Sequence, residues 1–184
     1  AAYNTNTAYV ADIRYASLAN YLANSPQPFA CPAENYVSAA QRAMGWNHRV
    51  RSVALNAAVG EGNKYMSPNP YGWTSWYNAK KSTDFKTPAP NQSFVFLDVS
   101  PDSIDDILFY TPPYPTAEFV ALPGNQHDGA AGITFADGHV EMHKWAGGVV
   151  PIRSVTYATY LSAIPCSPID PDMVWLAQHT PQSP

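Results

Sequence analysis

Charged side chains are scarce in this sequence. Asp, Glu, Lys and Arg make up 13% of the 184 residues, about half of the usual share near 25%. Only 10 Lys and Arg stand against 14 Asp and Glu, the formal net charge is −4, and no run of basic residues occurs. Because proteins hold nucleic acids through clusters of Lys and Arg, we expect no nucleic acid partner.

Long apolar runs and a signal peptide are also missing. The longest apolar run, Phe94–Leu97, has the length of a strand, whereas a membrane-spanning helix needs about 20 apolar residues. We therefore expect no membrane span in this chain. With no signal peptide visible at Ala1, the protein is either cytosolic or a chain whose export segment has been removed. The low charge and the frequent Asn, Tyr, Thr and Pro favour export.

Cysteine is limited to Cys31 and Cys166, which match no metal-binding spacing. Two interpretations stay open. The cysteines are either two buried thiols or the ends of a disulfide that joins an early and a late segment. A disulfide would require a location outside the cytosol.

Aromatic residues and prolines are abundant instead. Aromatics reach 13% of the chain and prolines number 18. A chain so rich in rings is expected to fold rather than to stay disordered, and prolines at this frequency leave little room for long helices. The length fits one domain over residues 1–184, with no internal repeat.

The hydrophobic pattern predicts both helices and strands. We expect a partial helix over 7–24, a short helix over 34–44 and a loop over 60–90. Strands are predicted at 51–56, 93–98, 107–110 and 119–122, followed by a hairpin over 133–145 and a helix over about 170–178. The predicted fold class is α+β, with helix first and an antiparallel sheet after it.

The hairpin carries the strongest local signal. Asp137-Gly138 stands between two alternating runs, which favours a two-residue turn. With such a turn, Phe135 lies opposite Val140 and Ile133 lies opposite Met142, which would form an apolar face. The other face is then predicted to carry Thr134, His139, Glu141 and His143.

Several segments together resemble a known family. His127 is followed by nine residues and then Asp137-Gly138. This spacing resembles the prepilin-type, processing-associated domain named for it, found in pseudopilin-like proteins of type II secretion systems. Further segments that fit the family are Cys31-Pro32-Ala33, Arg51-Ser52 through Asn56, Phe94–Asp98 with Pro101–Asp105, Phe135–His139, His143–Trp145 and Trp175-Leu176.

The resemblance implies a pilin-like fold, with a long N-terminal helix packed on an antiparallel sheet. It also implies a periplasmic or extracellular location and a role in a filament or in secretion. One difference is that family members begin with a short leader and a hydrophobic helix, whereas Ala1 begins in polar sequence. We expect a trimmed soluble domain rather than a protein that has lost its anchor.

An acidic loop is the first candidate site. Four carboxylates within nine positions are expected to bind calcium through their oxygens; they are Asp98, Asp102, Asp105 and Asp106. The spacing is not that of an EF-hand, and the calcium-binding loop of major pseudopilins supports the idea by analogy only. The alternative is a solvated loop whose Asp residues cap turns.

The His and Asp-Gly residues are open to two interpretations. We expect His127, Asp137 and Gly138 to be structural, with Asp137 and Gly138 setting the turn and His127 bonding to loop backbone. His139, Glu141 and His143 fall two apart on one strand face and suit zinc or copper. The alternative for these three is a polar face exposed to solvent.

The predicted loop over 60–90 carries a group of aromatic residues. These are Tyr65, Tyr71, Trp73, Trp76 and Tyr77. Three uses are open for these rings: packing in the protein interior, a protein interface, or stacking on sugars.

The sequence favours a function without catalysis. No Gly-x-Ser-x-Gly, His-Glu-x-x-His or phosphate-loop motif occurs. The leading hypothesis is a pseudopilin-like domain that assembles with other pilin-like subunits or binds secreted cargo. The alternative is a secreted carbohydrate-active protein, either a polysaccharide-binding module or a calcium-assisted polysaccharide lyase.

Overall fold

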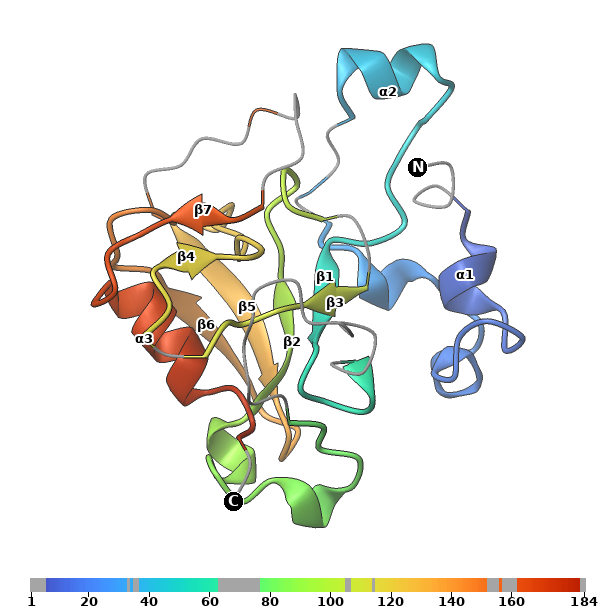
Figure 1. Ribbon diagram of the computed structural model, residues 1–184. Coiled ribbons are helices and arrows are strands. Elements are labelled where there is room, and N and C mark those ends of the chain that lie inside the picture. Colours follow the sequence, from blue (N-terminus) through green and yellow to red (C-terminus); the bar gives the residue numbers. More distant parts are fainter. Residues whose placement is uncertain are drawn as a thin grey trace.

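The computed structural model describes residues 6–32, 34, 37–62, 77–104, 107–113, 115–151, 156 and 162–182. The fold is α+β, with more sheet than helix, as the sequence predicts (Figure 1). Within these residues, no helix has both the length and the apolar character needed to span a bilayer.

A five-stranded sheet forms the centre of the fold. Its strand order is β3-β1-β2-β5-β6. All neighbouring pairs are antiparallel except β1 and β3, which run parallel. The strands are β1 (Val53–Asn56), β2 (Phe94–Asp98), β3 (Leu108–Phe109), β5 (Ala130–Phe135) and β6 (Val140–Lys144). A separate two-stranded sheet pairs β4 (Glu118–Phe119) with β7 (Ile164–Pro165).

The helices are short. The last one, α3 (Pro171–Gln178), begins as predicted, because the Asp170 carboxylate accepts bonds from the backbone N–H groups of Asp172 and Met173. In α2 (Ala39–Ala43), Ser38 and Gln41 form a capping box. The short helical turns are α1 (Ala8–Ala11), η2 (Ala19–Leu22), η3 (Gln27–Phe29), η5 (Ser82–Asp84) and η6 (Pro90–Gln92).

The helix predicted over 7–24 is interrupted. Between α1 and η2 the chain turns, and after η2 both Ala23 and Asn24 adopt positive φ angles of 50° and 57°. Left-handed backbone ends a right-handed helix. The N-terminal segment therefore consists of separate turns instead of one helix.

The main hydrophobic core lies between the five-stranded sheet and α3. Phe94, Leu97 and Ile133 from the sheet are fully buried with Met173 and Leu176 from the helix. Burying side chains of this size contributes about 1.5–3 kcal/mol each. Figure 1 shows α3, in red, lying across the sheet beside β6. This helix fixes which face of the hairpin is covered.

The hairpin register differs from the prediction by one residue. Phe135 N donates to His139 O, so the turn has three residues, and Thr134 pairs with Val140. A two-residue type I′ turn needs positive φ at both turn positions, but only Gly138, at 94°, has it. A slip of one residue turns every side chain to the opposite face. Val140 and Met142 are therefore exposed, while Glu141 and His143 share a face with Ile133.

Candidate functional site

The sheet topology brings distant segments together at one end. Because β1 and β5 each run antiparallel to β2, the residues before β1 and before β5 lie beside the residues that end β2. The turn after η3 reaches the same end, since Ser52 N bonds to Phe29 O. We call the polar side chains collected there the polar junction: Cys31, Glu34, Arg49, Ser52, Asp98 and His127.

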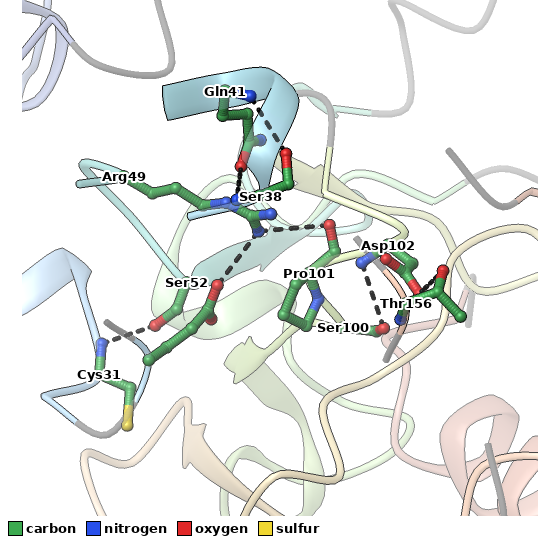
Figure 2. A network of polar contacts seen from close by, with 10 residues as sticks. Cys31, Ser38, Gln41, Arg49, Ser52, Ser100, Pro101, Asp102 and Thr156 are labelled. Carbon is green, nitrogen blue, oxygen red and sulfur yellow. Dashed lines mark hydrogen bonds and ion pairs between the residues drawn. The ribbon is translucent and has the colours of Figure 1, made fainter. Parts of the chain in front are cut away.

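A buried ion pair forms one half of the polar junction. Arg49 Nη1 lies 3.1 Å from Glu34 Oε1 and also donates to Pro101 O. Figure 2 shows Arg49 extending toward Pro101. The second oxygen of Glu34, Oε2, is buried and has no hydrogen-bond partner among the residues that the structure describes. Burial raises the pKa of Glu34 to about 7, against the lowering effect of Arg49 and with a further rise from Asp98.

Asp98 forms the other half. Its Oδ2 accepts a 2.8 Å bond from Gly132 N and lies 3.5 Å from His127 Nε2. Burial raises the pKa of this carboxyl, while the Gly132 bond and His127 act in the lowering direction. A Cβ atom at position 132 would lie 3.1 Å from Asp98 Oδ2, which explains why glycine fits here.

Cys31 and His127 meet in the same place. Cys31 N donates to Ser52 Oγ at 2.6 Å, and Cys31 Sγ lies 3.4 Å from His127 Nε2. Cys31 and Cys166 are both free thiols, so the disulfide that the sequence left open is not formed. Sequence reasoning missed the contact of Cys31 with His127 because 96 residues separate them and no local pattern links them.

Two of the four carboxylates of the acidic loop, Asp98 and Asp102, lie among the described residues. Asp102 Oδ2 accepts bonds from Thr156 N at 2.7 Å and Thr156 Oγ1 at 3.0 Å (Figure 2). Asp98 is bound to Gly132 instead. Asp105 and Asp106 lie outside the described residues. Among the residues that are described, no group of three His, Cys, Asp or Glu side chains is arranged to hold a metal ion, so calcium gains no support.

The His-nine-Asp-Gly residues lie at opposite ends of β5. His127 belongs to the polar junction, whereas Asp137 and Gly138 form the hairpin turn. Asp137 Oδ1 accepts bonds from His139 N at 3.1 Å and from His139 Nδ1 at 2.6 Å. The side-chain bond from His139 is the main cause that lowers the pKa of Asp137. Asp137 therefore contacts His139 rather than His127.

The histidines of the hairpin belong to a cluster of rings. His139 stacks on Phe135 at 4.3 Å between ring centroids. His143 and His179 each lie 4.0 Å from the Trp175 ring, on which both stack. Burial lowers the pKa of His143. The two imidazoles of the zinc or copper hypothesis thus both contact aromatic rings, and the hypothesis for His139, Glu141 and His143 stays a prediction.

A small pocket adjoins the polar junction. Its lining combines two guanidinium groups with an indole, an amide and apolar side chains; the residues are Gln41, Trp46, Arg49, Arg51, Pro101 and Ile104. This basic lining suits a carboxylate or another small anion.

Of the five aromatic residues singled out in the predicted loop over 60–90, one, Tyr77, lies within the described part of the chain. Tyr77 donates from its hydroxyl to Asp84 O at 2.9 Å. Tyr65, Tyr71, Trp73 and Trp76 lie outside the described residues. The choice among packing, interface and sugar stacking stays open for them.

Comparison of the chain with protein-family models, curated proteins and solved structures gave no match. The functional argument therefore starts from the surfaces and contacts of the chain itself.

Proposed function

We propose that this chain is a pseudopilin-like domain of the cell envelope or extracellular space that acts by assembling with other pilin-like subunits, without catalysis. The observation that carries the proposal is an apolar surface on the N-terminal segment. Its side chains are 43% to 85% exposed: Tyr9, Ile13, Tyr15, Leu18 and Tyr21. We call these five residues the N-terminal apolar surface.

The N-terminal apolar surface is organised by its own contacts. The Tyr9 and Tyr15 rings meet edge to face at 5.3 Å, and the Arg14 guanidinium lies over Tyr15. On the inner side, Val10 is buried with Phe29 and Val50. This anchoring directs the remaining rings outward. Exposed apolar side chains that recur along one short segment favour a protein interface there.

The family resemblance supports the same use of this segment. In pilin-like subunits the N-terminal segment precedes an antiparallel sheet, and here it precedes a sheet in which one strand pair, β1 with β3, is parallel and the others are antiparallel. The difference is that α1 and η2 are separate short turns rather than one long helix. A second copy of this chain is the partner that the proposal names for the test.

Sedimentation velocity over a wide concentration range tests this function. The parent chain is expected to self-associate. The double variant Ile13→Ser, Tyr21→Ser is expected to raise the dissociation constant at least about tenfold. The reason is that large apolar side chains at an interface contribute more than about 1.4 kcal/mol to binding. Met44→Ser with Ile169→Ser removes two side chains of similar exposure elsewhere and is the matched control. A parent chain that stays monomeric at millimolar concentration would contradict the proposal.

A second candidate function is binding of acidic carbohydrate. The pocket lined by Trp46, Arg49 and Arg51 favours it, because arginine binds carboxylates and an indole face stacks on a sugar ring. Titration with glucuronate is expected to give saturable binding that Trp46→Ala abolishes, while glucose gives none. Absorbance near 235 nm, followed with acidic polysaccharides with and without EDTA, separates binding from lyase activity. No binding and no absorbance change would remove this candidate.

A further inference from the structure

Three anchored groups converge at Cys31. A 2.6 Å bond to Ser52 Oγ holds the Cys31 backbone, and Ser52 is itself fully buried at the start of β1. His127 sits in a tight turn in which Asp128 and Gly129 both have positive φ, and Ala130 N bonds back to His127 O. Asp98 is fixed by Gly132 N. The thiol and the imidazole are therefore positioned by three separate parts of the fold.

Cys31 and His127 are also accessible. The His127 side chain is 30% exposed, and Cys31 is partly exposed. The Sγ–Nε2 distance of 3.4 Å is within hydrogen-bond range for sulfur. A thiol beside a base that can take its proton has the arrangement of an activated nucleophile.

We propose that Cys31 and His127 form a reactive thiol–imidazole pair that exchanges with an exposed disulfide of a small molecule or of a partner protein. The proposal does not depend on self-association. It assigns to the polar junction a covalent modification site, and it assigns to His127 a role beyond bonding to loop backbone.

The exchange needs no additional oxidant. The proton on Cys31 Sγ moves to His127 Nε2, and the thiolate attacks one sulfur of the disulfide R–S–S–R. The Cys31–S–S–R bond forms as the bond between the two R–S groups breaks. The leaving thiolate takes the proton from His127 Nε2. The products are one mixed disulfide and one thiol, so Cys31 is oxidised and half of the incoming disulfide is reduced.

Asp98 acts as a positioning and charge-balancing residue in this step. Its Oδ2 lies 3.5 Å from His127 Nε2, the same nitrogen that faces Cys31, so Asp98 contacts the reacting side of the imidazole and does not hold the opposite nitrogen. Among the charged groups nearby, Glu34 lies in the turn after Cys31 and pairs with Arg49. Asp128 pairs with Lys144 on the far side of the turn.

Cys166 provides a contrast within the same chain. Its pKa is raised by burial and then by the carboxylates of Asp170 and Glu118. Carboxylates disfavour a neighbouring thiolate. One molecule therefore carries a thiol beside an imidazole and a thiol beside two carboxylates, and each experiment has an internal reference.

The test is the rate of mixed disulfide formation with glutathione disulfide, measured by peptide mass spectrometry on both cysteines from pH 5.5 to 9.5. At pH 7, Cys31 is expected to react at least about tenfold faster than Cys166, below the ~10²–10⁴ typical of a positioned base. His127→Gln is expected to lower the Cys31 rate about tenfold at pH 7 and to leave it nearly unchanged at pH 9.5, where hydroxide replaces the base.

If His127→Gln fails to fold, the comparison of the Cys31 and Cys166 rates in the parent chain still tests the proposal. Equal or slower reaction of Cys31 than of Cys166 across the pH range would overturn the proposal. So would a His127→Gln profile that matches the parent, because a structural histidine leaves the shape of the pH profile unchanged. An increase of the Cys31 rate on addition of EDTA would also overturn it, since the thiol would then be a metal ligand.

Discussion

The polar junction and the N-terminus of α3 both bury carboxylates, but they satisfy them in different ways. At α3, Asp170 Oδ1 bonds to the first turn of its own helix and Oδ2 accepts from Gly148 N at 2.9 Å. Asp172 Oδ1 accepts from Ala146 N at 2.8 Å. We call Asp170, Asp172 and residues 146–148 the α3 cap. In the polar junction, by contrast, Glu34 pairs with the Arg49 guanidinium; among the described residues, Glu34 Oε2 and Asp172 Oδ2 are both buried without a hydrogen-bond partner.

The difference indicates two purposes for buried charge. The α3 cap supplies backbone N–H donors to its carboxylates, which is a structural use that closes a loop onto a helix. Burial raises a carboxyl pKa in both regions, at Asp172 and at Glu34, but the polar junction also places a base and a thiol within one partly accessible cluster. Groups of this kind are more typical of functional sites. Two substitutions separate the two regions, and a third tests the loop after β2; they follow in order of expected effect.

Gly147→Ala should give the largest effect, in the α3 cap. A Cβ atom there would lie 2.7 Å from Asp172 Oδ2. The Asp172 side chain is short and buried, and its hydrogen bond from Ala146 N holds it in place, so it cannot move away easily. We expect a loss of about 2–3 kcal/mol in the free energy of unfolding, as for overpacked sites, measured by urea unfolding. Gly148→Ala is the matched control, because its nearest atom, Asp170 Oδ2, is 3.8 Å away. Equal losses in the two variants would show that the α3 cap is not tightly packed.

Glu34→Gln tests the polar junction through pH. Burial raises the pKa of Glu34 in the folded chain from an ordinary 4.5 to about 7, so the folded chain binds the proton more tightly than the unfolded chain does. The stabilisation is fully present below pH 4.5 and is lost as the pH rises through 7. Relative to Glu34→Gln, the parent should gain on the order of 1–3 kcal/mol between pH 7.5 and 4.5.

Urea unfolding of both chains at several pH values measures this difference. Glu141→Gln, which removes an exposed carboxylate from β6, is the control and is expected to change stability by less than about 0.5 kcal/mol. A parent-to-variant difference that is constant from pH 4.5 to 7.5 would contradict the burial argument for Glu34.

Thr156→Val should give the smallest effect. It removes the hydroxyl that donates to Asp102 Oδ2 at 3.0 Å, while the backbone donor of Thr156 is kept. We expect a loss of about 1 kcal/mol, typical of one intramolecular hydrogen bond. Thr156→Ser, which keeps the hydroxyl, should retain most of that stability in the same thermal-unfolding measurement. A loss with Ser as large as that with Val would assign the effect to the methyl group instead.

The two regions also differ in how far the sequence predicts them. The Asp170-Pro171-Asp172 pattern predicts the start of α3, because capping involves residues two or three apart. The strands β1, β2 and β5 follow from alternating apolar residues in the same local way. The hairpin register does not, because it depends on whether Asp137 adopts positive φ, which Asp-Gly permits but does not require.

The polar junction could not be predicted from sequence spacing. Cys31 and His127 meet only because antiparallel pairing places the residues before β5 beside the end of β2, with the turn after η3 alongside. Pairing of the acids in the loop after β2 is equally non-local, since Asp102 binds Thr156 and Asp98 binds Gly132. Asp98 and Asp102, four positions apart in the sequence, therefore contact different segments of the chain.

The stack of His143, Trp175 and His179 has an optical consequence. Each imidazole lies 4.0 Å from the ring of Trp175, one from β6 and one from the end of α3. Indole fluorescence depends on the groups that contact the ring, so separation of the three rings would change the emission. Trp175 emission is therefore an intrinsic signal of whether α3 remains docked on the sheet, and it would detect local release of the helix before the whole chain unfolds.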